Sequence, residues 1–326
     1  MVNGPVRLGP VATWFPATSA RVASLTELDE LPAHRREHAL ALGIETVRTA
    51  DELSEVDLAA AAATAALDEA GLEAADIDAL LLVTGRAPQY LLASETTRLQ
   101  HRIGATRAFT AGVGDLGCVS VSAALTLAGA LLRADAGCRT VLVVAAAKTP
   151  TRHRYRPPMT LLGDGAAALL VTASGGRWEF VDQILRSDGK YADLFRIDYR
   201  DTPSRAWAEE CTDESSYSFR LAVESKKRFD VIIAELLERN DIQVDSVGPI
   251  LMQNLSGGAF AFWEEALDAT IDEACRSNLA AYGHLGSADM LVNLESAAAT
   301  RTSGAYALLL NSSPVAAWSA ALMRRV

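Results

Sequence analysis

Gly112-Val113-Gly114-Asp115-Leu116-Gly117-Cys118-Val119-Ser120 is a glycine-punctuated turn that leads into an apolar run of small residues, 121–132. That run has helical length, and Gly129 is its only glycine or proline. Phe109-Thr110-Ala111, before the turn, is typical of a strand end. Cys118 is therefore predicted on a sharp strand-to-helix turn, where unpaired N–H groups and the helix dipole favour a thiolate. Position alone does not separate a nucleophile from a small packed cysteine.

The bulk composition limits the class of protein. A chain of 326 residues, half of them hydrophobic, can form two domains or one large fold built of two halves. No 18-residue window is purely apolar, and Met1-Val2-Asn3-Gly4-Pro5 lacks a basic start and an apolar core, so we expect no membrane span, no signal peptide and a cytoplasmic location. A net charge of −11 argues against binding to nucleic acid or anionic membranes. Four scattered cysteines without C-x-x-C spacing predict neither a disulfide framework nor a metal site.

Strands and helices alternate along the chain. Ser54 is predicted to begin a helix that ends at Ala70, because Asp57 completes a near capping box. The other predicted helices are 25–31, 37–42, 94–103, the run after Cys118, 218–240, 259–269 and 288–300. The predicted strands are 6–15, 79–84, the strand ending at 111, 140–147, 165–172 and 249–254.

An internal match suggests a duplication. Gly165–Ser174 and Gly304–Ser313 are identical at six of ten positions, and the helix-loop-strand layout of the first half recurs in the second. The predicted class is α/β, with residues 1–174 as an N-terminal half that carries Cys118 and residues 175–326 as a C-terminal half that carries His284 and Asp289.

A nucleophilic cysteine needs a base, and His284 is the best candidate. It lies in a glycine-flanked turn, Tyr282-Gly283-His284-Leu285-Gly286, that enters a helix, and Asp289 follows five residues later. Asp289 would orient the imidazole while His284 takes a proton. In the alternative interpretation, His284 is a turn residue whose hydrogen bonds are satisfied locally, and Asp289 is a charge at the start of a helix. The remaining histidines, on predicted surface segments, are His34, His38, His101 and His153.

Several motifs resemble the ketoacyl synthase III branch of the thiolase-like condensing enzymes. Gly117-Cys118-Val119-Ser120 is similar to that family's nucleophile turn, and Ser187-Asp188-Gly189-Lys190-Tyr191-Ala192-Asp193-Leu194 to its Ser-Asp-Gly-x-Tyr-x-x-Leu segment. Leu162-Gly163-Asp164-Gly165-Ala166-Ala167 and the tail Trp318-Ser319-Ala320-Ala321-Leu322 also resemble family motifs. The matches run in order from near residue 6 to the C-terminus. The resemblance implies the duplicated five-layer α/β/α/β/α thiolase fold and a homodimer.

Two positions depart from the decarboxylating members, which use Cys, His and Asn. Their His lies in Pro-His-Gln-Ala-Asn, where this chain has Met252-Gln253-Asn254-Leu255-Ser256, so that Gln253 (or Asn254, in a register shifted by one) takes its place. Their Asn lies in Gly-Asn-Thr-Ser-Ala, where this chain has His284. The resulting Cys118, His284 and Asp289 set resembles the ketoacyl synthase III-like acyltransferases of natural-product pathways.

This resemblance implies transfer of an acyl group from an acyl carrier protein or CoA thioester, through a Cys118 acyl-enzyme, to a hydroxyl or amine. The acceptor would be a natural product such as a sugar or an aminocyclitol, and no cofactor or metal is expected. Gln253 or Asn254 would hydrogen-bond the acyl carbonyl or the acceptor. In relatives a backbone N–H of the glycine-rich loop completes the oxyanion hole; here Pro314 has no N–H, so Ser313 or Val315 must serve, or the hole has moved.

A basic loop offers a docking site for the donor. Arg152, Arg154 and Arg156 lie on an otherwise acidic protein, whereas a carrier protein and its phosphopantetheine phosphate are anionic; a solvated loop is the alternative. The other functions kept open are a decarboxylative ketoacyl synthase III that starts polyketide or fatty-acid chains, an inert partner subunit, and an α/β binding protein whose cysteine is structural.

Overall fold

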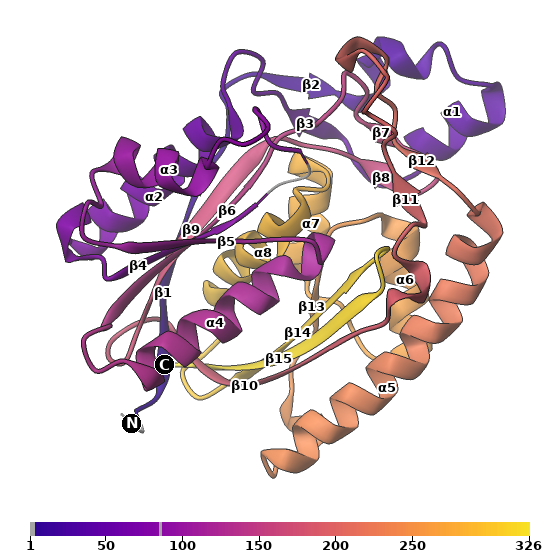
Figure 1. Cartoon of the computed structure of the whole chain (residues 1–326). Coiled ribbons are helices and arrows are strands. Elements are labelled where there is room, and N and C mark those ends of the chain that lie inside the picture. Colours follow the sequence, from indigo (N-terminus) through magenta and orange to yellow (C-terminus); the bar gives the residue numbers. More distant parts are fainter. Residues whose placement is uncertain (1–3, 85–86) are drawn as a thin grey trace.

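Nine strands form one mixed β-sheet that carries both halves of the chain (Figure 1). The computed structural model describes residues 4–84 and 87–326, so Met1-Val2-Asn3, part of the start that predicts no signal peptide, lies outside the described residues. The strands of this sheet, in spatial order, are β13 (Leu251–Met252), β14 (Tyr306–Ser313), β15 (Ala317–Arg325), β10 (Trp178–Ser187), β1 (Val6–Trp14), β9 (Gly165–Thr172), β6 (Thr140–Ala147), β4 (Ala79–Val83) and β5 (Phe109–Val113). Three short pairs of strands are β2 (Ser19–Arg21) with β3 (Thr46–Arg48), β7 (Tyr155–Arg156) with β8 (Thr160–Leu161), and β11 (Phe195–Arg196) with β12 (Glu210–Cys211).

The strand pairing shows the duplication. In the first half β1 pairs antiparallel with β9, β9 antiparallel with β6, and β6 parallel with β4. In the second half β10, β15, β14 and β13 repeat the same three kinds of pairing in the same order. The halves join where β1 pairs antiparallel with β10, with Leu8 opposite Trp178.

The sequence match that suggested the duplication does not align equivalent strands. Gly165–Ser174 covers β9, which pairs antiparallel on both sides, whereas Gly304–Ser313 covers β14, which occupies the place of β6. Both are buried strands rich in Ala and Leu, and that shared environment is enough to explain the similarity. The duplication is thus carried by topology, and the match between these two segments was wrong as an alignment.

The helices complete five layers, as predicted (Figure 1). Their bounds are α1 (Ala33–Leu40), α2 (Glu55–Ala70), α3 (Glu95–Ile103), α4 (Ser120–Ala134), α5 (Ala222–Arg239), α6 (Gly257–Leu267), α7 (Glu273–Tyr282) and α8 (Asp289–Ala298). Helices α2 and α3 pack on the outer face of the first-half strands, α4 and α8 lie in the middle, and α5 covers the second-half strands. Because α8 also contacts β1 and β9, the halves interlock, and the division of the chain into residues 1–174 and 175–326 stays a prediction.

Most local predictions agree with the structure. Ser54 caps α2 through the capping box with Asp57, and Gly71 ends the helix in the left-handed conformation. The first short helices differ: 3-10 turns occupy 22–24 and 26–28, and α1 begins at Ala33, directly after Pro32, because proline fits a helix start.

The short strands of the three small pairs were not predicted, nor were the longer elements β10, β15 and α7. In β10 a register shift between Phe180 and Asp182 interrupts the alternation of apolar and polar residues. Strand β15 is buried on both faces and has no alternation to detect, and α7 has little amphipathic pattern.

One helical segment of the described residues, Gly117–Ala134, is long and apolar enough to cross a membrane, but 56% of it is buried inside the protein. It consists of α4 and the turn before it, which pack against strands of both halves. This is the position of a core helix.

Candidate active site

Cys118 lies in a tight turn between β5 and α4. Asp115 and Gly117 both have positive φ, and a 3-10 turn, Gly117–Val119, continues directly into α4. A side chain at Gly117 would collide with Ser313 Oγ, so this position requires glycine for space as well as for conformation. Cys118 is buried at the start of a helical segment, as predicted, where the helix dipole stabilises a negative charge.

Two residues of the second half of the chain bind the backbone of this turn. Asn311 on β14 donates from Nδ2 to the Cys118 carbonyl at 2.7 Å, and Ser287 donates from Oγ to the Gly117 carbonyl at 2.9 Å. The backbone of the turn that carries the sulfur is therefore held by residues 193 and 170 positions away in the sequence.

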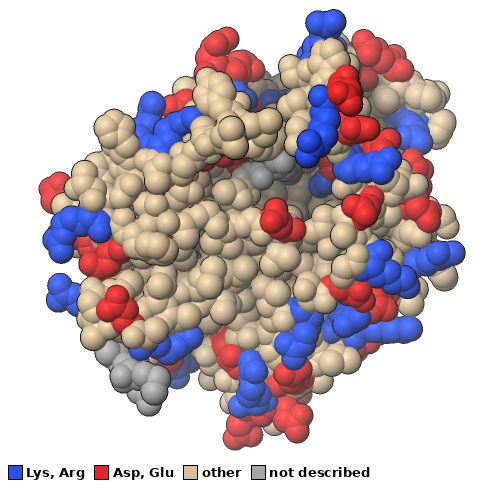
Figure 2. All heavy atoms as spheres, viewed as in Figure 1, with Lys and Arg blue, Asp and Glu red and all other residues tan. Residues whose placement is uncertain are grey.

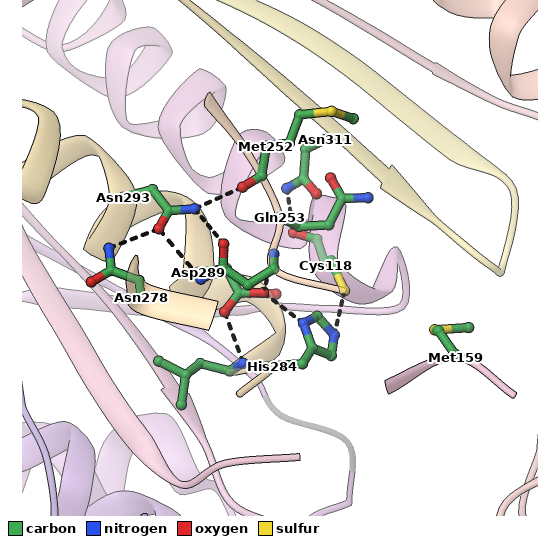
Figure 3. A network of polar contacts seen from close by, with 12 residues as sticks. Cys118, Met159, Met252, Gln253, Asn278, His284, Asp289, Asn293 and Asn311 are labelled. Carbon is green, nitrogen blue, oxygen red and sulfur yellow. Dashed lines mark hydrogen bonds and ion pairs between the residues drawn. The ribbon is translucent and has the colours of Figure 1, made fainter. Parts of the chain in front are cut away.

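The predicted base reaches the sulfur. His284 Nε2 lies 3.3 Å from Cys118 Sγ, and His284 Nδ1 lies 2.6 Å from Asp289 Oδ2 (Figure 3). Both His284 and Asp289 are fully buried. With Nδ1–H donating to the carboxylate, Nε2 faces the sulfur, so the structure brings these three residues into one line.

Backbone geometry sets this alignment. Gly283 has a φ of 67°, and a Cβ there would lie 2.8 Å from the Leu161 carbonyl, so the turn before His284 requires glycine. His284 then donates its own N–H to that carbonyl at 2.9 Å. Asp289 is the first residue of α8, and the Leu285 N–H donates to its Oδ1 at 2.8 Å.

The charges around His284 control its protonation. Complete burial by itself would lower its pKa, but negative charge on Cys118 and Asp289, together with the hydrogen bonds to both, outweighs burial and raises the pKa from 6.5 to about 9. His284 is therefore an imidazolium at neutral pH for as long as Cys118 carries charge.

A buried network of amide groups, which the sequence analysis did not predict, hydrogen-bonds to Asp289 (Figure 3). The Asn254 N–H donates to Asp289 Oδ2 at 2.9 Å, and the Asn254 side chain exchanges hydrogen bonds with Asn293. Asn293 also donates to the Met252 carbonyl at 2.7 Å and accepts from Asn278 at 2.9 Å. Asn293 lies within an apolar stretch of α8, and its full burial is the feature that singles it out.

The three predicted substrate-positioning residues lie in different surroundings. Gln253 Nε2 donates to Ser312 O and Oγ, and its Oε1 accepts from the Ser312 N–H at 3.3 Å, so this amide connects β13 to β14. Asn254 contributes its backbone to Asp289 and its side chain to Asn293. Ser313 lines the cavities beside Cys118, and its Oγ accepts from the Val315 N–H at 3.3 Å.

The three arginines of the basic loop have different surroundings. Arg154 donates to both carboxylate oxygens of Asp164, at 3.1 and 2.8 Å, and together these hydrogen bonds and charges lower the Asp164 pKa although burial alone would raise it. Arg156 forms an ion pair with Glu209, and both side chains are mostly buried. Arg152 is exposed. The structure thus brings Arg156 alone of the three to the Cys118 cavity.

Two cavities of similar size meet at Cys118. One, of about 210 Å³, has polar and small walls that include Thr84, Asp115 and Arg156. The other, of about 220 Å³, has apolar walls that include Met159, Leu221 and Phe262. Cys118, Ser313 and Pro314 line both, so a substrate carbonyl held over the sulfur would have space on two sides.

The other cysteines and histidines lie outside the line of Cys118, His284 and Asp289; His34, His38 and His101 are exposed, as predicted, and His153 is partly buried. Burial raises the pKa of Cys275 to about 12, and it also raises the pKa of Cys138 and Cys211. His38 contacts the Pro158 carbonyl and His153 contacts Glu27. Within residues 4–84 and 87–326, no group of three or more His, Cys, Asp or Glu side chains is placed to hold a metal ion.

Comparison with known proteins identifies the family. The model of the 3-oxoacyl-[acyl-carrier-protein (ACP)] synthase III family matches residues 115–189, which include Cys118. A beta-ketoacyl-[acyl-carrier-protein] synthase III of Synechococcus sp. strain WH7803 is 30% identical over 306 residues, 87% of this chain and 85% of the relative. The corresponding enzyme of Rubrobacter xylanophilus is 31% identical over 207 residues, so the alignment spans only 62% of each protein.

The fold has close counterparts among solved structures. ChlB3, described as an acyltransferase, superposes with a TM-score of 0.82 at 21% identity, covering 99% of this chain and 98% of ChlB3. The predicted thiolase-like fold and the resemblance stated from the sequence are thus confirmed. The chain belongs to the ketoacyl synthase III family of thiolase-fold condensing enzymes.

Proposed function

We propose that this protein is an acyltransferase that moves an acyl group from a thioester to a hydroxyl or amine through a Cys118 acyl-enzyme. The observation that carries this proposal is the buried line from Cys118 to His284 to Asp289, with separations of 3.3 and 2.6 Å. A sulfur, a base and an orienting carboxylate in this order are the parts needed for covalent acyl transfer.

In the first half-reaction the Cys118 thiolate attacks the thioester carbonyl. A new C–S bond forms, the carbonyl electrons move to oxygen, and collapse of this oxyanion expels the donor thiolate. The His284 imidazolium gives its proton to the departing sulfur, so the enzyme is left acylated with a neutral imidazole.

The same imidazole then becomes the base for the second half-reaction. Acylation removes the negative charge from Cys118, and that charge is one cause of the raised His284 pKa. The pKa must therefore fall in the acyl-enzyme, where neutral His284 accepts the proton of the incoming O–H or N–H. Attack on the acyl carbonyl releases the product and restores the thiolate–imidazolium pair.

Two groups beside the sulfur suit the oxyanion. The Cys118 amide lies at the start of a helical segment, and the Ser313 hydroxyl lines both cavities. Because Ser313 Oγ already accepts from the Val315 N–H, its proton is directed toward another acceptor. The hydroxyl would thus replace the N–H that Pro314 lacks.

The second candidate function is decarboxylative condensation, favoured by the names of the relatives. The resemblance implies a His/Asn pair for that reaction, and here Gln253 stands at the His position with both ends of its amide bonded to Ser312. A single base held by Asp289 suits deprotonation of an acceptor better than stabilisation of a carbanion.

The donor would be an acyl carrier protein or CoA thioester, and the acceptor a natural product. A thioester is already activated, so the proposed route uses no cofactor. Arg152, exposed in the basic loop, is the side chain best placed to meet an anionic carrier. The cytoplasmic location predicted from the sequence stays part of this proposal.

A homodimer is also proposed. Strand β5 is an edge of the sheet, and Phe109 on β5 and Leu127 on α4 are 62% and 46% exposed. Figure 2 shows few charged side chains over this face. A second copy pairing along β5 would cover it. Phe109→Glu should then shift the species seen by sedimentation velocity from dimer to monomer.

Intact mass spectrometry tests the function. The protein is incubated with acetyl-, malonyl- and longer acyl-CoA, and then with nucleophilic acceptors while product mass and CO₂ are followed. We expect an acyl adduct that Cys118→Ala abolishes, and a product that keeps the whole malonyl group. Stoichiometric CO₂ with a new carbon–carbon bond would restore the ketosynthase.

A further inference from the structure

A separate and larger cavity lies beside the active site. It measures about 650 Å³, three times the volume of either cavity at Cys118, and lies against the β11–β12 hairpin and the turn between these strands. Its walls are mainly apolar and aromatic, with Phe195, Tyr199 and Trp207 the largest. Cavities of this size and lining bind small molecules with apolar bodies.

Arg156 connects this cavity to the active site. Its side chain lines both the large cavity and the polar cavity that contains Cys118. The guanidinium lies 5.0 Å from the centre of the Phe195 ring and forms an ion pair with Glu209, which lines the large cavity as well. A molecule seated in the large cavity therefore contacts this ion pair, and Arg156 separates it from the Cys118 cavity.

We propose that the large cavity binds the ring system of the acceptor, and that this ring system is apolar, flat and substituted by a hydroxyl or amine. Tyr199 and Trp207 form an edge-on aromatic pair with centroids 6.0 Å apart, and such walls favour further aromatic rings over an isolated sugar, which offers no flat apolar face of this size. The polar substituent extends past Arg156 toward the acyl group on Cys118. This inference rests on the proposed acyl transfer.

The acyl donor fits the large cavity less well. An acyl group bonded to Cys118 must begin in one of the two smaller cavities, which have room for a short chain. The pantetheine arm is linear and narrow, and it would leave most of this wide cavity between Phe195 and Trp207 unfilled. A wide aromatic cavity next to the reacting sulfur therefore suits the second substrate.

Binding to the resting protein tests this without any turnover. The probe is alizarin, a flat dihydroxyanthraquinone, and its affinity is measured by calorimetry and by quenching of tryptophan fluorescence, with glucose as the polar comparison. We expect alizarin to bind and glucose not to bind. Trp207→Ala and Tyr199→Ala should each raise the alizarin Kd by about tenfold or more, since each removes an aromatic wall. Phe262→Ala, in the apolar cavity on the other side of Cys118, is the matched control and should leave the Kd unchanged.

Three results would overturn the assignment. The first is that alizarin does not bind at all, and the second is that Phe262→Ala weakens alizarin binding as much as Trp207→Ala and Tyr199→Ala do. The third is that Trp207→Ala and Tyr199→Ala dissociate a dimer. The last would show that a partner subunit fills the cavity. Acylation of Cys118 by acetyl-CoA, followed by intact mass, should be the same in both cavity variants as in the native protein. If alizarin binds as expected but Cys118 is never acylated, the proposed function fails and the cavity remains a ring-binding site.

Discussion

Replacing His284 with Gln tests the charge pair at the centre of the site. Glutamine has an amide near the imidazole in size but cannot carry a proton. In the native protein the rise of the His284 pKa from 6.5 to about 9 corresponds to about 3 kcal/mol in favour of the imidazolium. This is a net value: burial opposes it, and the charges of Cys118 and Asp289, with Cys118 the larger of the two, together with their hydrogen bonds outweigh burial. Because coupling between two titrating groups is reciprocal, the imidazolium stabilises the thiolate as much as the thiolate stabilises the imidazolium.

The expected effect is a change in the pH dependence of Cys118 alkylation. At acidic pH the native thiolate is held by the imidazolium, so iodoacetamide should react about tenfold to a hundredfold faster with the native protein than with His284→Gln. As the pH rises through about 9 the imidazolium loses its proton, so the native thiolate loses the charge that stabilises it. The ratio of the two rates should then approach one.

Intact mass and peptide mapping follow the alkylation site by site. Cys275 serves as an internal control, because burial raises its pKa to about 12 and it should stay unmodified in both proteins. Superimposable rate profiles for the native protein and His284→Gln across the range from about pH 5 to 9 would refute the charge pair. His284 would then act only as a base.

Three further variants test the parts around this pair. Asp289→Asn should lower acyl transfer about a hundredfold while the acyl-enzyme accumulates, because the imidazole loses its orienting partner but can still accept a proton; rapid-quench mass spectrometry measures both. Ser313→Ala should slow self-acylation of Cys118 by about a hundredfold with little change in thioester affinity, whereas an unchanged rate would place the second oxyanion donor elsewhere. Asn293→Ala should lower the free energy of unfolding by about 1–3 kcal/mol in urea titrations, because the Met252 carbonyl loses its buried donor, and should also lower kcat without raising KM for the thioester.

Local signals in the sequence predicted much of the fold and the line of three site residues. The capping box at Ser54 depends on residues three apart, and the turn at Cys118 depends on glycines next to it. A short 3-10 turn, Gly286–Ala288, leads from His284 to Asp289, the first residue of α8, so the proximity of these two side chains is also a local feature. Such features are readable because a short stretch of chain determines its own geometry.

Features that depend on distant partners were not readable in the same way. The sequence predicts Arg154 as part of a basic surface cluster, but in the structure it forms an ion pair with Asp164. Nothing in the sequence around Asp164 indicates that it pairs with this arginine. Asn293 sits in an apolar run, and nothing next to it in the sequence shows that Asn254 and Asn278 converge on its side chain. Only the mutual packing of β13, α7 and α8 brings these amides together.

The location of the imidazole determines what the site can do. At the end of β13, where relatives are expected to carry histidine, the side chain is Gln253. Both ends of its amide form hydrogen bonds with Ser312. In the turn before α8, by contrast, the Asp289 carboxylate lies against Nδ1 and is itself held by the N–H groups of Asn254 and Leu285. An imidazole held in this way presents a single Nε2 to the sulfur, which suits stepwise proton transfer. Two donors aimed at a substrate carbonyl, as the resemblance implies for decarboxylation, would require hydrogen-bonding side chains on both elements, and the proposed function assigns no such role to Gln253, whose amide bonds to Ser312.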